Sequence, residues 1–204
     1  MSLTIGSPSA ELLAEDSTTP LFESFFAGAR FFDEPQEGGG VYAAGQEEGT
    51  NILIFSDEIS DGNDVAVGGN EIDILMAGAG NDNFNGAGGT DFVFGGFGDD
   101  IVRGGTGDDV VVGNEGSDLA ISGEGADVYE FFASQFVEGE TDTLLDFDLG
   151  SDSIVIVGST DVSVSNVGGT TLLSIDEFEN AIAFRLDATD SLNVVTRTNS
   201  TVLF

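Results

Sequence analysis

The chain contains no cysteine, no histidine and no lysine, and its cationic side chains are four arginines. Without cysteine, neither disulfides nor thiol chemistry can contribute to stability or function. Without histidine, neither the zinc-protease helix motif nor a Ser-His-Asp triad is possible. Without lysine, a Walker-type phosphate loop is excluded as well. The missing residue types therefore remove the common hydrolase and nucleotide-binding mechanisms, and we expect a protein that is not an enzyme.

Long apolar segments are also missing. No segment approaches the roughly 20 apolar residues of a membrane helix, and residues 1–20 lack the basic and apolar parts of a cleavable secretory signal. Taken alone, these absences predict a cytoplasmic protein. The formal net charge of −34 repels anionic membranes and nucleic acids, so we expect neither membrane insertion nor a nucleic-acid partner.

Acidic residues dominate the composition, with 38 Asp and Glu in 204 residues. Such an excess of one charge opposes compaction through self-repulsion. A disordered acidic chain would show a similar imbalance, but a hydrophobic content of 40% with 17 Phe argues against disorder. A halophilic surface is compatible with the same composition. The charge therefore calls for a compensating partner.

Part of the acidic content is strictly periodic. Between residues 59 and 130 an aspartate recurs every nine residues, and the whole segment can be written as nonapeptides in that frame. A fixed period with a carboxylate at one position indicates a repeat architecture whose turns share ligands. The periodic aspartates are Asp64, Asp73, Asp82, Asp91, Asp100, Asp109, Asp118 and Asp127.

Each nonapeptide divides into a turn and a short strand. Glycines at positions one, two and four permit positive φ, so the first six residues can form a tight turn with carbonyls facing one point. The aspartate at position six adds a charged oxygen, and an all-oxygen shell suits Ca²⁺. Side chains alternate along a strand, so the apolar residues at position eight are expected to fill the interior. These are Ala66, Leu75, Phe84, Val93, Val102, Val111, Ala120 and Tyr129.

The repeats Gly95–Arg103 and Gly104–Val112 follow the pattern G-G-x-G-x-D-x-U-x. This pattern resembles the repeats-in-toxin (RTX) family, the hemolysin-type calcium-binding repeat. The resemblance implies an all-β fold, a right-handed parallel β-roll in which two nonapeptides make one turn and Ca²⁺ lies between repeats two apart. It further implies backbone ligands from the turn glycines. Those assigned here are Gly78, Gly80, Gly89, Gly96, Gly98, Gly105, Gly107, Gly116 and Gly125.

The resemblance also sorts the aspartates into two rows, which we name the first and the second edge. The first edge holds Asp64, Asp82, Asp100 and Asp118, and the second edge holds Asp73, Asp91, Asp109 and Asp127. Each row has three gaps, so about six Ca²⁺ ions are expected. Six ions would bring the net charge from −34 to −22.

Some positions depart from the pattern. Glu71 replaces the glycine at position four, and because glutamate resists positive φ, that turn is expected to be strained or reshaped. Asn114 at position two is a milder change, since asparagine tolerates the left-handed region. The segment 49–54 reads as a degenerate earlier repeat with Asn51 in the aspartate position, provided that four residues are inserted before Asp64.

We expect three segments: an N-terminal flank (1–50), the calcium-binding β-roll (51–130) and a C-terminal β flank (131–204) that caps the roll. Helical spacing from Pro20 predicts a short N-terminal capping helix, and residues 33–49 read as a linker. An alternative for the N-terminal flank is a docking patch for a partner. Its residues would be Phe22, Phe25, Phe26, Phe31 and Phe32.

After Tyr129 the nine-residue period stops. Residues 142–156 resemble the segment that follows the last repeat in RTX proteins and are expected to form a turn and a strand that continue the sheets. The run Glu138, Glu140 and Asp142 could supply one extra ligand to a terminal ion, although a solvated acidic loop is the favoured interpretation. A hairpin is expected at 161–166 and 170–175 around two glycines, followed by strands at 181–186 and 192–196.

The family resemblance reverses the cytoplasmic expectation. RTX proteins are typically exported by type I machinery that reads an uncleaved C-terminal signal, so we expect a secreted or cell-surface protein that folds on binding Ca²⁺. Its role would be a structural or interaction module in a surface, matrix or adhesive assembly, with a protein or glycan partner or self-association. The alternative is a C-terminal calcium module of, or accessory to, an extracellular enzyme acting on polysaccharide.

Overall fold

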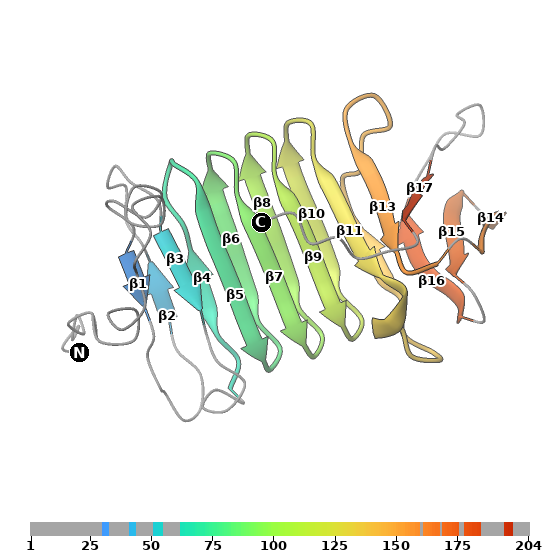
Figure 1. Cartoon of the computed structure of the whole chain (residues 1–204), viewed down its shortest axis with the longest axis horizontal. Helices are drawn as coiled ribbons and strands as arrows, with labels where there is room; N and C mark the ends of the chain where they lie inside the picture. The colour runs from blue at the N-terminus through green and yellow to red at the C-terminus, as the bar shows by residue number, and fades with distance from the viewer. Residues whose placement is uncertain are drawn as a thin grey trace, which may run out of the picture.

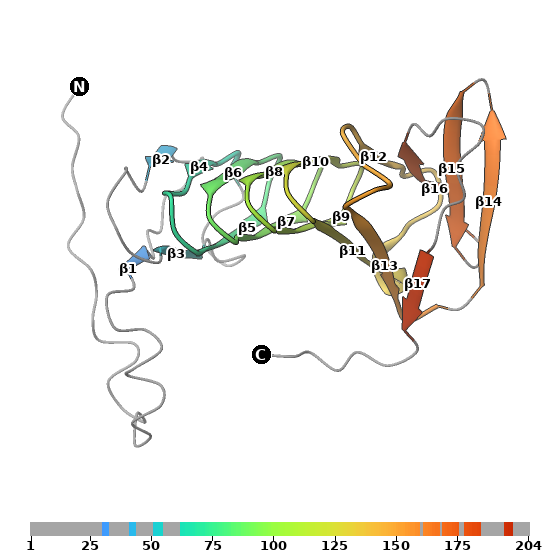
Figure 2. The same cartoon turned by 90° about the horizontal axis from the view of Figure 1, so that it is seen from above.

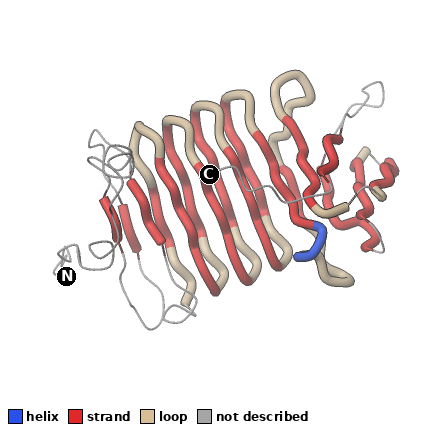
Figure 3. The backbone as a smooth tube through the Cα atoms, in the orientation of Figure 1, coloured by secondary structure: helices blue, strands red, loops and turns tan. Residues whose placement is uncertain are grey.

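The computed structural model describes residues 30–32, 41–43, 51–54, 62–159, 161–167, 169–175, 178–184 and 194–197. Within these ranges the chain consists mainly of β-strands, and the single helical element is a 3-10 turn, η1 (Ala133–Gln135). The strands stack into a flattened solenoid with its long axis across the strands (Figure 1, Figure 3). The predicted all-β parallel roll is confirmed. The helix predicted from Pro20 lies outside the described residues.

Two sheets form the broad faces of the solenoid, and from β1 to β13 consecutive strands alternate between them (Figure 2). The eight-stranded sheet contains, in spatial order, β1 (Arg30–Phe32), β3 (Asn51–Ile54), β5 (Asp73–Ala79), β7 (Phe92–Phe97), β9 (Val110–Glu115), β11 (Val128–Phe132), β13 (Ser153–Val157) and β17 (Val194–Arg197). The nine-stranded sheet contains β2 (Val41–Ala43), β4 (Val65–Val67), β6 (Asn83–Gly88), β8 (Ile101–Thr106), β10 (Leu119–Glu124), β12 (Asp142–Leu144), β16 (Phe178–Phe184), β15 (Thr170–Ile175) and β14 (Val162–Val167).

The register of the central strands repeats every two nonapeptides. In the parallel pair β6 and β8, Phe84 lies opposite Val102, and in the pair β7 and β9, Val93 lies opposite Val111. Position eight of one repeat therefore always meets position eight of the repeat two further on. This confirms that two nonapeptides build one turn.

The same ladders extend before the regular repeats. Asn51 of β3 lies opposite Asp73 of β5, which places it in the aspartate position as predicted. The two residues are 73 − 51 = 22 apart, four more than the regular 18, so the predicted four-residue insertion is confirmed. The linker expected at 33–49 is wrong for β2, because Val41–Ala43 pairs in parallel with Val65–Val67. The apolar Val41-Tyr42-Ala43 stretch can add a strand because β4 offers a free ladder edge.

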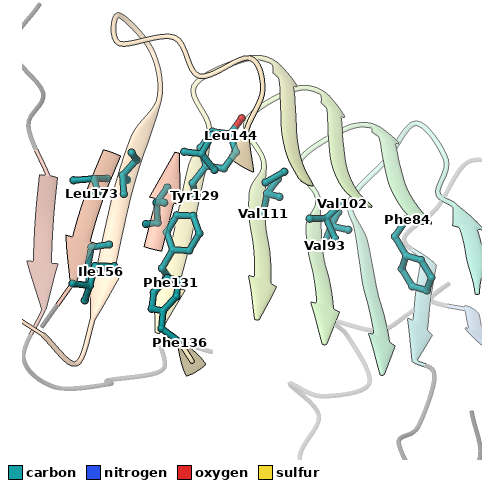
Figure 4. Packing of buried hydrophobic residues seen from close by; sticks show 14 of the residues in the cluster. Phe84, Val93, Val102, Val111, Tyr129, Phe131, Phe136, Leu144, Ile156 and Leu173 are labelled. Carbon is teal, nitrogen blue, oxygen red and sulfur yellow. The ribbon is translucent and has the colours of Figure 1, made fainter. Parts of the chain in front are cut away.

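The hydrophobic core lies between the two sheets, where side chains from successive turns pack along the roll (Figure 4). Every predicted position-eight residue is at most 3% exposed, from Ala66 to Tyr129. Burying a Val, Leu or Phe side chain contributes about 1.5–3 kcal/mol. Because each turn contributes few side chains to this core, its stability depends on contacts with the neighbouring turns, as in other solenoids.

Beyond the repeats, β12 continues the nine-stranded sheet on β10 and β13 continues the eight-stranded sheet on β11. The expectation that residues 142–156 continue the sheets is confirmed. The hairpin is confirmed as well, since β14 and β15 pair antiparallel with Val167 opposite Thr170. Strands β16 and β17 correspond to the two further strands expected from the sequence.

A polar cap covers the turn that begins the last repeat. The carboxylate of Asp146 accepts hydrogen bonds from the backbone N–H groups of Ser122 (3.1 Å) and Gly123 (2.9 Å) and from the hydroxyl of Tyr129 (2.7 Å). Backbone donors at the end of a sheet need such partners, because a buried unpaired N–H is costly. Tyr129 thus contributes its hydroxyl to this cap while its side chain is part of the hydrophobic core.

Candidate metal-binding edges

The eight periodic aspartates lie where the turns of the roll enter the strands. Asp73 is the first residue of β5, and each of the others directly precedes a strand. All eight are buried, with at most 3% of their surface exposed. Because strands from the two sheets begin on opposite sides, the aspartates fall into the two predicted rows. Contacts between residues 18 apart establish both rows.

One oxygen of each carboxylate joins consecutive turns. The backbone N–H of Asp82 donates to Oδ1 of Asp100 at 2.7 Å, and the N–H of Asp100 donates to Oδ1 of Asp118 at 2.8 Å. The second edge has the same arrangement, with the N–H of Asp91 donating to Oδ1 of Asp109 at 2.8 Å. Each aspartate side chain therefore reaches back one full turn and orients the aspartate before it.

The other carboxylate oxygen has no hydrogen-bond partner. Oδ2 is buried and unpaired in the last six aspartates of the repeat frame, namely Asp82, Asp91, Asp100, Asp109, Asp118 and Asp127. A buried charged oxygen without a partner is strongly unfavourable. A bound cation would supply the missing partner, so these residues fit the group that the repeat pattern implies.

Backbone carbonyls converge on the same oxygens. A Cβ atom added to Gly95 would lie 2.4 Å from Oδ2 of Asp100 and 2.5 Å from the carbonyl oxygen of Gly113. At Gly86 the corresponding distances are 2.4 Å to Oδ2 of Asp91 and 2.7 Å to the carbonyl oxygen of Gly104. A carboxylate oxygen and a carbonyl oxygen from the next turn thus share one small space, which is a donor set that suits Ca²⁺.

These glycines at position one were not among the predicted site residues. The sequence signal for them was the leading glycine of the motif, which had been attributed to turn formation alone. The structure adds a steric reason, since any side chain at Gly86 or Gly95 would fill the space beside the unpaired oxygen.

The nine predicted turn glycines at positions two and four all have positive φ, between 96° for Gly78 and 152° for Gly125. Stacking also requires glycine here. A Cβ atom on Gly98 would lie 1.8 Å from the carbonyl oxygen of Gly80 in the preceding turn. The predicted conformation is confirmed, whereas direct ligation of a metal by these residues stays a prediction.

The irregular turns follow the sequence departures. Neither Glu71 nor Gly69 has positive φ, so the turn containing Glu71 is reshaped rather than strained. The reshaped turn points the N–H of Gly69 at Oδ2 of Asp73, at 2.5 Å. Ala87 (φ 81°) and Asn114 (φ 77°) are the only non-glycine residues with positive φ in the described part of the chain.

Polar residues at position five form a second ladder that sequence reasoning missed. On the first edge the N–H of Asn81 donates to Oδ1 of Asn63 (3.0 Å), and the N–H of Asp99 donates to Oδ1 of Asn81 (3.2 Å). The N–H of Ser117 continues the series on Oδ1 of Asp99 (2.9 Å). These side chains reach forward to the next turn, whereas the position-six aspartates reach back. The available signal was the run of hydrogen-bonding residues at position five.

Burial makes the edges electrostatically unfavourable for bare carboxylates. Desolvation raises the pKa of Asp100 to about 8, with the backbone hydrogen bond to Asp82 opposing the shift and neighbouring carboxylates adding to it. The same cause raises the pKa of Asp91 to about 7 and that of Asp109 to about 6. Each edge therefore favours either protons or a cation.

Both rows continue beyond the nine-residue period. The N–H of Asp118 donates to Oδ1 of Asp142 at 2.9 Å across 24 residues, and the N–H of Asp127 donates to Oδ1 of Asp152 at 3.2 Å across 25 residues. The preference for a solvated loop at Asp142 is wrong, since this residue begins β12 and is 1% exposed. The segment around η1 lengthens the connection between turns, so a search for aspartates at a fixed nine-residue period misses Asp142 and Asp152.

In the part of the chain that the structure describes, no three acidic side chains converge tightly enough to hold a metal by themselves. Sites built from carboxylates and backbone carbonyls of successive turns agree with that finding. No helix among the described residues is long and apolar enough to cross a membrane.

Comparison with protein families gives an independent match to the repeat region. The model of the RTX calcium-binding nonapeptide repeat, which spans four copies of the repeat, matches residues 59–93 and again residues 94–129. Together the two matches cover a little over a third of the chain. They contain all eight periodic aspartates, and each match includes aspartates of both edges. No curated protein matches the sequence.

Proposed function

Because the chain is an RTX protein with hemolysin-type calcium-binding repeats, we propose that it is exported and folds on binding Ca²⁺ outside the cell. There it serves as a structural or interaction module rather than as an enzyme. Six Ca²⁺ ions, one for each gap between successive aspartates of an edge, complete the repeat region.

The observation that carries this proposal is the set of buried, unpaired Oδ2 atoms. Six repeat aspartates have such an oxygen, one for each expected gap. Burial raises the pKa of Asp100, and the like charges of Asp82 and Asp118 across its two gaps add to that rise. A divalent cation in each gap supplies both the missing partner and the missing charge.

The same arrangement explains why export and folding would be coupled. Extracellular calcium modules bind Ca²⁺ with Kd values of about 10⁻⁴–10⁻³ M. At a free Ca²⁺ concentration of 100 Kd, each site that binds only the folded chain adds about 2.7 kcal/mol of stability. Cytosolic Ca²⁺ would leave such sites empty and the acidic chain extended, which suits passage through an exporter. RTX repeats are typical of proteins secreted by type I systems.

Calcium removal tests the proposal. In excess chelator we expect the far-UV circular dichroism spectrum to lose its β signal and the elution volume in size exclusion to shift to an expanded chain. Adding Ca²⁺ should restore both in one cooperative transition, while equimolar Mg²⁺ should not, because Mg²⁺ demands a smaller octahedral shell. An unchanged compact β spectrum in chelator would contradict calcium-dependent folding.

Location and activity need separate measurements. Immunoblots of cytosol, envelope and medium should place the protein outside the cell, and blocking type I export should retain it inside. Turnover of a polysaccharide by the purified protein, lost on substitution of an acidic residue outside the two edges, would instead support an enzymatic role.

A further inference from the structure

Asp142 reproduces the contacts of a repeat aspartate although it lies outside the repeats. The N–H of Asp118 reaches its Oδ1 at 2.9 Å, compared with 2.8 Å from the N–H of Asp100 to Asp118. The backbone repeats as well, since the N–H of Thr143 donates to the carbonyl of Asp118 at 2.8 Å, as the N–H of Leu119 does to that of Asp100. Asp142 therefore occupies position six of an additional turn on the first edge.

The free oxygen of Asp142 is in the same condition as those of the repeats. Asp142 is 1% exposed, and its Oδ2 is buried without a hydrogen-bond partner. Hydrogen bonds within the protein satisfy only Oδ1. A carboxylate held in this way needs a cation or a proton, for the same reason as Asp100 or Asp118.

A third acidic group lies beside this gap. Glu140, two residues before Asp142, also has a buried oxygen without a hydrogen-bond partner, Oε2. Its charge acts on both Asp118 and Asp142. Seven of the eight repeats have glycine two residues before the aspartate, and only the reshaped turn has a carboxylate there, Glu71. Glu140 thus adds a negative charge close to this gap, without the three carboxylates forming a metal site by themselves.

At the end of the second edge, both carboxylate oxygens of the last aspartate have hydrogen-bond partners. Oδ1 of Asp152 accepts hydrogen bonds from the N–H of Asp127 (3.2 Å) and the hydroxyl of Ser151 (3.1 Å), and its Oδ2 accepts one from the N–H of Asp148 (2.8 Å). The loop before β13 therefore satisfies both oxygens of the last aspartate in this row.

We propose that the first edge binds one further Ca²⁺ ion between Asp118 and Asp142, with Glu140 as an additional oxygen donor, and that the second edge has no counterpart between Asp127 and Asp152. Two of its three carboxylates, those of Glu140 and Asp142, lie beyond the residues that match the repeat family, which end at residue 129. The inference rests on the proposed calcium binding of the repeats, and it predicts an odd number of ions distributed unequally between the edges.

The test is a count of bound Ca²⁺ in Asp142→Asn and Asp152→Asn, by equilibrium dialysis and elemental analysis at saturating free Ca²⁺. Asparagine keeps the Oδ1 acceptor and the side-chain volume while removing the charge. We expect Asp142→Asn to bind one ion fewer than the wild type, with an unchanged β spectrum. Asp152→Asn should bind as many ions as the wild type.

Equal counts in the wild type and Asp142→Asn, or equal losses in both variants, would overturn the extra site while leaving calcium-dependent folding intact. Failure of the wild type to bind Ca²⁺ at all would instead remove the proposed function. If Asp142→Asn does not fold, a Ca²⁺ titration of Glu140→Gln replaces the count of bound ions. One ion bound about tenfold more weakly than in the wild type then supports the site, and an unchanged titration overturns it.

Discussion

On the first edge the row of aspartates ends at Asp142, whose second oxygen is buried and unpaired. On the second edge it ends at Asp152, whose two oxygens both accept hydrogen bonds from the protein. Near the beginning of the second edge, Oδ2 of Asp73 also has a partner within the protein, because the reshaped turn directs the N–H of Gly69 at it. The repeats between these ends are nearly identical.

If the proposed ion distribution holds, an aspartate in the correct position does not by itself define a cation site. The local turn decides, because a backbone N–H directed at the carboxylate supplies the partner that a cation would otherwise provide. The family pattern records the aspartate but not the direction of the neighbouring N–H groups. Site counts taken from the pattern alone would therefore treat the two edges as equal.

The largest expected difference is between Asp118→Ala and Asp127→Ala, the last repeat aspartates of the two edges. Asp118 borders the gaps to Asp100 and Asp142, whereas Asp127 borders one gap, to Asp109. At free Ca²⁺ of 100 Kd, losing two ions costs about 5 kcal/mol and losing one costs about 2.7 kcal/mol. Thermal unfolding at fixed Ca²⁺ measures the difference.

Both substitutions delete the same hydrogen bond to the preceding aspartate, so they are matched controls for each other. In excess chelator the difference between them should disappear. Equal losses of stability in Ca²⁺ would mean that the edges carry equal numbers of ions.

A smaller difference is expected in the pH dependence of the metal-free fold. Burial raises the folded-state pKa of Asp100 to about 8 and that of Asp109 to about 6, from the ordinary aspartate value of 3.8. A raised pKa means that the folded state binds more protons, so this stability is fully present below about pH 4 and is lost as the pH rises through the folded pKa. In chelator, acidification from pH 8 should therefore promote compaction, and protons should compete with Ca²⁺.

Asp100 and Asp109 should respond over different pH ranges. Asp100→Asn should flatten the circular dichroism signal in chelator between pH 6 and 8, whereas Asp109→Asn should alter it mainly below pH 6. Compaction that is independent of pH in both variants and in the wild type would contradict the role of burial in these shifts.

The smallest expected effect concerns the two non-glycine residues at positive φ, Ala87 near the second edge and Asn114 near the first. Ala87→Gly should stabilise the calcium-bound protein by about 1 kcal/mol, because left-handed strain in alanine exceeds the entropic cost of glycine. Asn114→Gly should bring no gain, since asparagine tolerates this conformation and Asn114 Oδ1 accepts a hydrogen bond from Gln135 at 2.7 Å. Equal changes in the melting temperatures of the two calcium-bound variants would contradict the expected difference in strain between Ala87 and Asn114.

The sequence was sufficient to predict the roll, its register and its core, because each depends on a period. A residue type repeated at position eight can only face one interior, and Val93, Val102 and Val111 do so. The degenerate repeat at Asn51 was also recognisable, since four inserted residues leave the strand itself intact.

The sequence was insufficient wherever a contact crosses an irregular connection. Asp142 and Asp152 lie 24 and 25 residues from their partners, so no fixed spacing selects them among the many acidic residues of the C-terminal flank. Strand β2 was missed because three residues carry too little pattern without their neighbour β4. Unpaired oxygens depend on where N–H groups point, which residue types alone do not determine.

The hydrogen-bonded ladders between turns run along the long axis of the roll, and paired residues are 18 apart through the central repeats. A pulling force along that axis would therefore load one turn at a time instead of shearing a whole sheet. Each released turn would lengthen the chain by about 60 Å, at roughly 3.4 Å per residue, while shortening the stack by about one strand spacing of 4.8 Å. The roll would therefore extend under force in steps of one turn each.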